Sequence, residues 1–475
     1  MRVAAVALWL GLASTPAWAQ IPPQVPAKPA PPPAQLDAKK AEVVQKGVKF
    51  LVSSQEPDGS WSYKNSPVVH VHYPMKAGVT ALCALALLKC GVDPQEAPIQ
   101  RAFEYLDKAE PRFTYEQAVI LLAAEARAAW TPPPPPGSGS EGGTATKKSK
   151  PKPDALDLKL ARRALAFLLQ HQTKTGLWRY PGPGDEEDLS NSQYVMLALW
   201  AAERLGLDVP KAVYERAALR LIECQEQDGP DVPSFPFPGA DLSFKELKKI
   251  EEEFEKELRK LDKRFEGKAA EARDEKGETR ADAMRTIERG AAQRVQEGTR
   301  TRGKVPGERP GMKARGWTYA PPGQPRQHRL DGIVTGSMVT SGLAGLLVCK
   351  SQLEGTSRYE KELKGRINQA LRDGAAWLAL NFSVTQNPNS DLHHFYFLYG
   401  LERAGVLGVL DKLGTHDWYL EGATYLIGAQ FQSDGHWLAA QGTASEVPDT
   451  CFALLFLARG TVPVVRLPSR VRTGD

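Results

Sequence analysis

The sequence lacks an apolar run long enough to span a bilayer. Its N-terminal apolar stretch, Val3 to Leu12, is too short for a membrane-spanning helix, which needs about 20 residues. A basic residue precedes this stretch and Ala17-Trp18-Ala19 follows it, which is the pattern of a secretory signal peptide cleaved after Ala19. We therefore expect an exported protein, periplasmic or extracellular, that does not span the membrane once residues 1–19 are removed.

Cysteine is also scarce, with five in 475 residues. Cys83, Cys90, Cys349 and Cys451 stand in apolar helical runs, where a small buried thiol is usual. Cys83 and Cys90 lie about 10 Å apart along one helix, which is too far for a disulfide. The odd count and these positions argue against a disulfide framework, even in an oxidising compartment.

Several functional motifs are missing as well. Outside the segments discussed below, no Gly-rich phosphate loop, Ser-His-Asp order or paired-carboxylate spacing rises above chance. Its net charge of +5 comes partly from a lysine-rich run, residues 147–152, so we expect no nucleic-acid partner. The Pro-rich leader, residues 20–40, and a Pro/Gly/Ser/Lys linker, residues 132–153, cannot bury apolar surface and are expected to stay unpacked.

What the sequence does contain is an internal repeat. Each copy is an amphipathic segment followed by a glutamine, a glycine that permits a turn, and a tryptophan whose ring can cover the helix end. Two copies agree at every repeat position, and another is split by a long insertion. The repeat residues are Gln55, Gly59, Trp61, Gln172, Gly176, Trp178, Gln225, Gly316, Trp317, Gln430, Gly435 and Trp437.

Hydrophobic periodicity predicts six pairs of helices between residues 41 and 459. The amphipathic members are 41–55, 95–108, 155–172, 211–225, 361–380 and 418–430. The more continuously apolar members are 78–90, 114–126, 192–205, 337–349, 392–404 and 449–458. A helix that is apolar all round must be enclosed, so we expect six inner helices ringed by six outer ones, with an open solenoid as the alternative.

The insertion, residues 241–315, has a pattern of its own. Phe244, Leu247, Ile250 and Phe254 recur at intervals of three and four among dense Lys and Glu, which indicates a helix with a narrow apolar seam. The segment from Met284 to Val295 is a candidate for the returning helix. We expect a charged helical hairpin, with a partly disordered insert as the alternative. Residues 460–475 are expected to form a C-terminal tail.

The glutamine-to-tryptophan repeat resembles that of the squalene-hopene cyclases and their relatives, including the β subunits of protein prenyltransferases. The resemblance covers residues 41–459 apart from the linker and the insertion. It is closest to exported bacterial proteins known only for these repeats, in segments such as Asn191-Ser192-Gln193-Tyr194 and Glu402-Arg403-Ala404-Gly405. It implies an all-α fold, an (α/α)6 toroid of the terpenoid cyclase and protein prenyltransferase type with a central cavity, without implying a reaction.

The acid motif of the cyclases is incomplete here. These enzymes protonate an alkene with an Asp-x-Asp-Asp motif, because so weak a base needs a strong acid. The nearest segment, Glu446-Val447-Pro448-Asp449-Thr450, has proline at the donor's position. A second acidic run, residues 185–188, lies in a Pro-Gly loop and is expected to be a solvated turn.

A zinc site is the other chemistry that the resemblance implies. Prenyltransferase β subunits bind zinc through an Asp-x-Cys pair and a histidine. Here His394 matches the histidine position, while Asp449 and Cys451 supply the other ligand types but follow the histidine helix. The helix expected to carry the pair offers Ser337 and Met338. One hypothesis is a zinc site of His394, Asp449 and Cys451; the alternative is a capping Asp449, a packed Cys451 and no cofactor.

Two functions remain open at this point. The first is a non-catalytic exported toroid that binds an apolar, lipid-like ligand or a protein partner, with the charged insertion as a contact arm. The second is a divergent terpenoid cyclase or prenyltransferase-like enzyme, with metal assistance through His394. The sequence does not identify the ligand, the oligomeric state or the size of the cavity.

Overall fold

The computed structural model describes residues 33–63, 75–132, 151–180, 186–266, 273, 277–324, 331–439 and 445–467. Regular structure in these ranges is helical except for two short antiparallel ribbons, so the predicted all-α fold is confirmed. None of the helices in these ranges is long and apolar enough to cross a membrane. The predicted signal peptide and most of the predicted linker lie outside the described residues.

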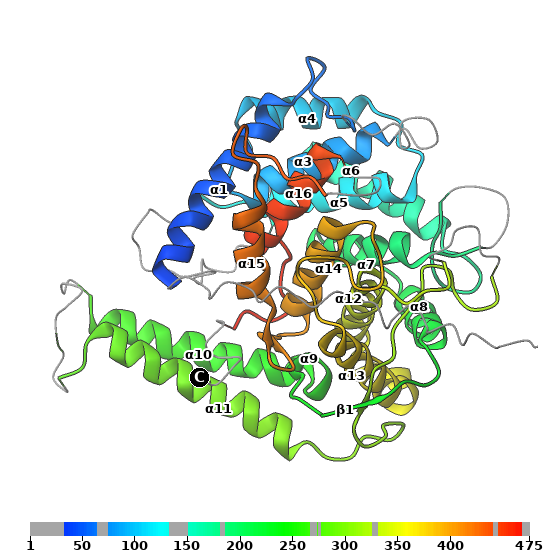
Figure 1. The fold of residues 1–475 in the computed structure, drawn as a ribbon, viewed down its shortest axis with the longest axis vertical. Helices are drawn as coiled ribbons and strands as arrows, with labels where there is room; N and C mark the ends of the chain where they lie inside the picture. Colours follow the sequence, from blue (N-terminus) through cyan, green and yellow to red (C-terminus); the bar gives the residue numbers. More distant parts are fainter. Residues whose placement is uncertain are drawn as a thin grey trace, which may run out of the picture.

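Six helices that are buried on nearly all sides form an inner layer. They are α3 (Lys76–Lys89), α5 (Thr114–Ala128), α7 (Leu189–Arg204), α12 (Gly336–Leu353), α14 (His394–Leu407) and α16 (Glu446–Leu457). In α3 every side chain from Ala77 to Leu88 is buried, as expected of a helix that is apolar all round. Each inner helix contacts the next, and α16 contacts α3, so the contacts close a cycle (Figure 1).

Six amphipathic helices cover this inner layer. They are α1 (Pro33–Ser53), α4 (Ala97–Lys108), α6 (Ala155–Gln170), α8 (Lys211–Cys224), α13 (Lys364–Leu380) and α15 (Trp418–Ala429). In α4 the buried residues are Ile99, Ala102, Phe103 and Leu106, which form a single stripe at intervals of three and four. The first helix, α1, contacts both α15 and α16, so the chain returns to its own beginning.

The repeat tryptophans join the two layers in the same way four times. Each indole N–H donates to a carbonyl in the last turn of the preceding outer helix, and each ring is fully buried. The pairs are Trp61 with Leu51, Trp178 with Leu168, Trp317 with Leu221, and Trp437 with Leu426. Carbonyls in a last helical turn have no partner within the helix. The rings therefore cover the helix ends, which is the packing predicted for these residues.

The repeat glutamines connect neighbouring outer helices. Each side-chain amide donates to two carbonyls. The first lies in the same turn for Gln55, Gln172 and Gln430, and belongs to Arg315, beyond the insertion, for Gln225. The second belongs to the next outer helix around the ring. The second acceptors are Pro98 for Gln55, Val213 for Gln172, Ala370 for Gln225, and Val43 for Gln430. The bond from Gln430 to Val43, 2.7 Å long, joins the last outer helix to the first.

Gly59 shows why the turn needs glycine. Its φ of +86° is unfavourable for other residues, and a Cβ there would lie 2.5 Å from the carbonyl oxygen of Arg101. Gly176 and Gly435 repeat this arrangement against Arg216 and Lys46. The glycine therefore allows the turn to pack directly on the backbone of the next outer helix.

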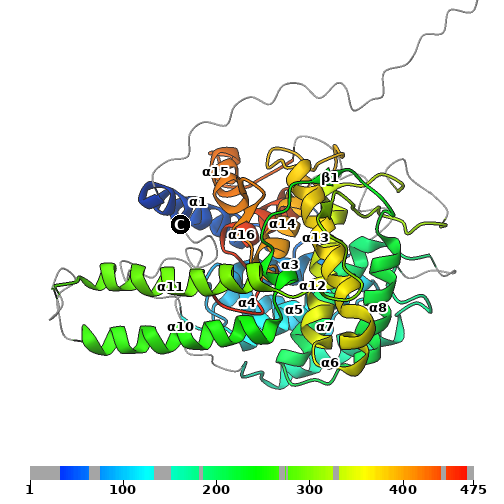
Figure 2. The same cartoon turned by 90° about the horizontal axis from the view of Figure 1, so that it is seen from below.

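The predicted charged helical hairpin is confirmed. Helices α10 (Phe244–Arg264) and α11 (Arg280–Thr301) lie side by side and extend away from the ring of helices (Figures 1 and 2). Their shared seam includes the buried Phe254, Leu261 and Ala291. At the base, α9 (Pro238–Asp241) and the ribbon of β1 (Asp231–Val232) and β2 (Met312–Lys313) attach the hairpin to the ring.

The remaining elements lie close to the ring. A single π-helical turn, η2 (Tyr359–Leu363), leads into α13. The second ribbon, β3 (Lys412–Leu413) with β4 (His416–Asp417), precedes α15.

The ends of the described chain differ from the predicted ones. The leader was expected to stay unpacked to residue 40, but α1 begins at Pro33 and buries Leu36. Proline is tolerated in a first helical turn because its missing N–H would have no partner there. After α16, Val465 and Leu467 are buried, and Thr461 bonds to Glu402 of α14. The expected tail is therefore packed on the ring as far as residue 467.

Candidate functional site

The structure does not bring the three predicted zinc ligands together. The Nε2 atom of His394 lies 2.9 Å from the carbonyl oxygen of Val384. Asp449 Oδ2 accepts from the Ala439 amide at 2.9 Å, and Cys451 Sγ lies 3.5 Å from another thiol. Across the described ranges, no group of three or more His, Cys, Asp and Glu side chains is placed to hold a metal ion. In this structure each of the three residues contacts a partner outside the set instead.

The surroundings of Asp449 and His394 also do not produce a strong acid. Burial raises the pKa of Asp449 to about 7, while one backbone N–H partly offsets this effect. Burial lowers the pKa of His394 to about 4. Asp449 is thus a weak acid, whereas the alkene protonation implied by the resemblance needs a strong one.

The acidic run at residues 185–188 was predicted to be solvated, but its last two residues are buried. Glu187 accepts from the Leu177 amide at 2.8 Å and from Arg220 Nε at 2.7 Å. Asp188 is the N-cap of α7, since its Oδ1 accepts from the Asn191 amide at 2.6 Å. The prediction failed because these carboxylates satisfy backbone amides that would otherwise be buried without a partner.

Aromatic side chains from four inner helices meet at the centre of the ring. Tyr115 of α5 and Tyr396 of α14 come from opposite sides of the cycle, and their hydroxyl oxygens are 3.4 Å apart. The ring of Tyr194, on α7, lies 5.1 Å from that of Tyr115 and 6.1 Å from that of Tyr396. Phe452 of α16 packs edge-on against Tyr396. Side chains therefore meet where the resemblance implied open space.

Three more tyrosines approach this centre from the turns. Tyr63, Tyr180 and Tyr319 each follow a repeat tryptophan by two positions and keep part of their surface exposed. The ring of Tyr180 lies 5.7 Å from that of Tyr115. We call the following set the tyrosine cluster: Tyr63, Tyr115, Tyr180, Tyr194, Tyr319, Tyr396 and Tyr399. Burial raises the pKa of every member, so the hydroxyls stay protonated at physiological pH.

Arg403 packs against the tyrosine cluster and is fully buried. Its guanidinium carbon is 4.1 Å from the ring centroid of Tyr399 and 4.9 Å from that of Tyr194. One nitrogen donates to Gln193 Oε1 at 2.8 Å, while Nε and Nη1 have no hydrogen-bond partner among the described residues. Cation–π contacts with the aromatic ring faces therefore stabilise much of the buried positive charge of Arg403.

Hydrogen bonds connect Arg403 to the tyrosine hydroxyls of the cluster. Because Arg403 donates to Gln193 Oε1, the Gln193 amide nitrogen faces Tyr396 and donates to its hydroxyl. Tyr396 is then free to donate to Tyr115. Separately, the Ser190 hydroxyl donates to Asp188 Oδ1 at 2.6 Å. The chain runs in one direction, since Arg403 can only donate.

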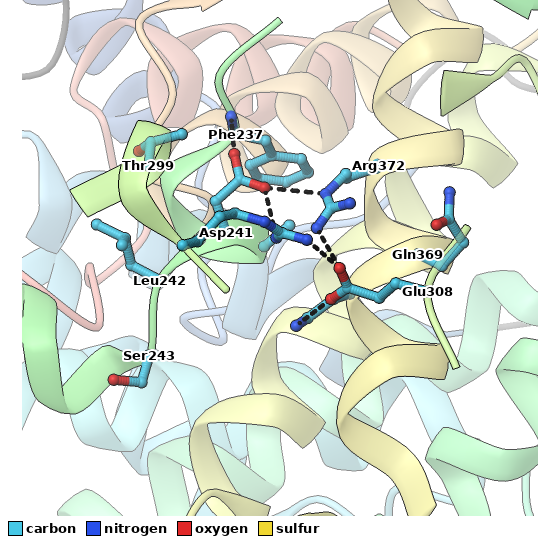
Figure 3. A network of polar contacts seen from close by, with 12 residues as sticks. Phe237, Asp241, Leu242, Ser243, Thr299, Glu308, Gln369 and Arg372 are labelled. Carbon is cyan, nitrogen blue, oxygen red and sulfur yellow. Dashed lines mark hydrogen bonds and ion pairs between the residues drawn. The ribbon is translucent and has the colours of Figure 1, made fainter. Parts of the chain in front are cut away.

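A second polar network fixes the base of the hairpin (Figure 3). Asp241 Oδ1 accepts from Arg372 Nε at 2.9 Å and from Arg302 Nη1 at 2.9 Å. Glu308 Oε2 accepts from Arg372 Nη2 at 2.9 Å and also from Arg302. We call these four residues the charge clamp. Its two acids and two arginines alternate, so each charge has two opposite neighbours, and α13 is tied to both ends of the insertion.

Lys350, on the inner helix α12, binds backbone carbonyls at the same base of the hairpin. Its Nζ atom donates to the carbonyl oxygens of Gly239, Ala240 and Leu242 and to Asn368 Oδ1, at 2.9 to 3.2 Å. Burial lowers its pKa to about 8, with nearby carboxylates acting in the other direction. The buried ammonium thus satisfies backbone carbonyls around α9.

Comparison with protein-family models found no matching model, and comparison with curated proteins found no matching protein. Three members of the tyrosine cluster follow a pattern in the sequence, because Trp-x-Tyr recurs at residues 61–63, 178–180 and 317–319.

Proposed function

We propose that the protein is an α/α toroid of the terpenoid cyclase and protein prenyltransferase type that binds a ligand at the tyrosine cluster. The fourfold recurrence of the glutamine and tryptophan bonds supports this family. The cycle of inner-helix contacts, which α16 completes against α3, supports it as well. We also propose that residues 1–19 direct export.

The observation that carries the ligand proposal is the mixed chemistry of the tyrosine cluster. The partly exposed rings of Tyr63, Tyr180 and Tyr319 offer apolar faces, while Tyr115 and Tyr396 offer hydroxyls beside them. Such a surface suits a lipid-like molecule with an apolar body and a polar end. Asp449, with a pKa of about 7, fits binding better than alkene protonation.

The test is to identify and quantify what the exported protein carries. Native mass spectrometry of the purified chain, followed by solvent extraction, is expected to show a bound lipid-like molecule. Tyr396→Phe removes the hydroxyl that links Gln193 to Tyr115 and should weaken binding roughly 2–10-fold, the value of one hydrogen bond.

Tyr425→Phe is the matched control, because Tyr425 lies on the outer helix α15. Its binding should equal that of the wild type. Unchanged binding by both variants, at unchanged thermal stability, would contradict the proposed site.

A second candidate function is capture of a partner protein by the hairpin. The charge clamp favours it, because a fixed base makes a projecting hairpin a rigid arm. A shallow, open groove of about 360 Å³ between α10 and α11 is lined by Lys249, Glu253, Arg294 and Glu297 among others, which suits charged side chains of a partner.

A further inference from the structure

Cys83 and Cys451 form a pair at the seam where the ring closes. Their Sγ atoms lie 3.5 Å apart, and both side chains are fully buried. Cys83 belongs to α3, the first inner helix, and Cys451 belongs to α16, the last. The pair therefore joins the two ends of the inner layer.

We propose that Cys83 and Cys451 form a disulfide that closes the ring covalently when the protein folds under oxidising conditions. Each thiol gives up its hydrogen and one Sγ–Sγ bond forms. The two electrons and two protons reduce a second disulfide, such as oxidised glutathione or an oxidised thiol oxidase, to two thiols. The pairing does not depend on any ligand of the tyrosine cluster.

The geometry requires little movement. A disulfide bond is about 2.05 Å long, so the two sulfurs must approach by roughly 1.5 Å, which side-chain rotation and a small helix shift can supply. The two helices already contact one another. No other two cysteine sulfurs in the described residues are in contact, so the structure selects one pairing among the five thiols.

Burial determines when the bond can form. It raises the pKa of the Cys83 thiol well above its usual range, so the reactive thiolate is rare once the ring is packed. Exchange is therefore expected while α16 docks against α3, before both sulfurs are enclosed. The bond would close a loop of most of the chain, and constraints on long loops reduce the entropy of the unfolded state most.

The experiment is thiol mapping of the full chain. Protein made in a reducing cytosol is unfolded, refolded with oxidised glutathione, and then denatured in excess alkylating agent without reductant. Peptide mass spectrometry should show a Cys83–Cys451 linked peptide and alkylation of the other three cysteines. Alkylation of all five, or a link involving Cys90, would overturn the proposal. Refolding in vitro separates this result from any failure of export.

A second measurement detects the disulfide through its effect on thermal stability. The thermal midpoint of oxidised wild type should fall by several degrees when dithiothreitol is added. Cys451→Ala should lose this dependence on reductant. Cys349→Ala, a matched change at a fully buried cysteine of α12, should keep it. A midpoint that never responds to reductant in the wild type would contradict the disulfide.

Discussion

Trp178 illustrates how one residue connects the two layers. Its indole N–H satisfies the Leu168 carbonyl, its backbone N–H donates to Ser192 of α7, and its ring is fully buried. A single side chain and its backbone thus satisfy polar groups at the end of α6 and the start of the next inner helix.

Replacing Trp178 by phenylalanine should therefore be costly. The change removes the bond to Leu168, leaves a buried carbonyl without a partner and creates a small cavity, for a loss of about 2–4 kcal/mol in the free energy of unfolding. Urea denaturation followed by circular dichroism measures this loss. Trp130→Phe is the control, because the Trp130 indole nitrogen has no hydrogen-bond partner among the described residues, and it should cost less than about 1 kcal/mol. Equal losses would refute the role given to the indole bond.

Asp449 gives the stability a defined pH dependence. Its folded pKa, about 7, is raised above the unfolded value of 3.8, so its contribution is complete below about pH 4 and is lost as the pH rises to about 7. Asp449→Asn should remove this decline and gain stability relative to wild type at about pH 8, but not at about pH 4. Chemical denaturation at the two pH values tests it.

Asp58 supplies a control of opposite sign. Its pKa is lowered to about 2, mainly by its hydrogen bond with Ser60, so its contribution is present above about pH 4 and lost as the pH falls towards 2. Asp58→Asn should therefore lower stability at neutral pH. A difference between wild type and Asp449→Asn that does not change with pH would contradict the burial of that carboxyl.

The position of the hairpin depends on the contacts at its base. Arg372→Met removes one member of the charge clamp and leaves Asp241 and Glu308 with only Arg302 between them. Breaking a largely buried network costs about 2–4 kcal/mol. We expect faster hydrogen exchange across α9, α10 and α11, with the inner helices unaffected.

The matched control is Arg294→Met, within the hairpin itself. Arg294 pairs with Glu253 and Glu257, but these groups are more than a third exposed, so the change should cost at most about 0.5 kcal/mol. Similar exchange in both variants would mean that the clamp does not hold the hairpin.

The outer part of the hairpin should be dispensable for the ring. Replacing residues 251–295 with a short Gly/Ser connection keeps the clamp, Lys350 and its carbonyl partners in place. The shortened chain should retain the thermal midpoint of the ring, because loops of this kind add little closure entropy. It should no longer bind a partner protein that contacts the hairpin. Unchanged binding of that partner would rule out the hairpin as its contact arm.

Periodicity predicted the elements well because both layers have distinct patterns. Every predicted helix is present, and most lie within four residues of their predicted ranges, although α1 begins eight residues earlier than predicted and α11 ends six residues later. The starts were harder to predict: α14 begins at His394 because His393 adopts a left-handed conformation with φ of 60°. The charge clamp was not predictable, since Asp241 and Arg372 are far apart in the sequence and only the fold brings them together.

The site was predicted less well than the fold, for a physical reason. Residue types chosen by resemblance, such as His394 and Cys451, say nothing about which side of a helix faces a partner. Gln430 and Trp437, by contrast, serve their own turn, so their local spacing was sufficient. The tyrosine cluster forms because helices on opposite sides of the ring bring Tyr115 and Tyr396 together. The local spacing within one repeat does not specify which helices face each other.

In the molecule as a whole the chain closes on itself, with α1 against α15 and α3 against α16. The distance between Gln45, on α1, and Ser433, just after α15, reports this closure, and both side chains are exposed and can be labelled. Spin labels at these two positions, with the half-buried Cys90 replaced by serine, report this distance by pulsed electron resonance.

Contact between the first and last outer helices, which are about 10 Å apart when packed, predicts one narrow distance distribution below roughly 25 Å. An open array of six helix pairs, each displaced by about 10 Å from the next, would separate the labels by roughly 50 Å. A long or broad distribution would contradict ring closure, and with it the proposed family and the Cys83–Cys451 disulfide.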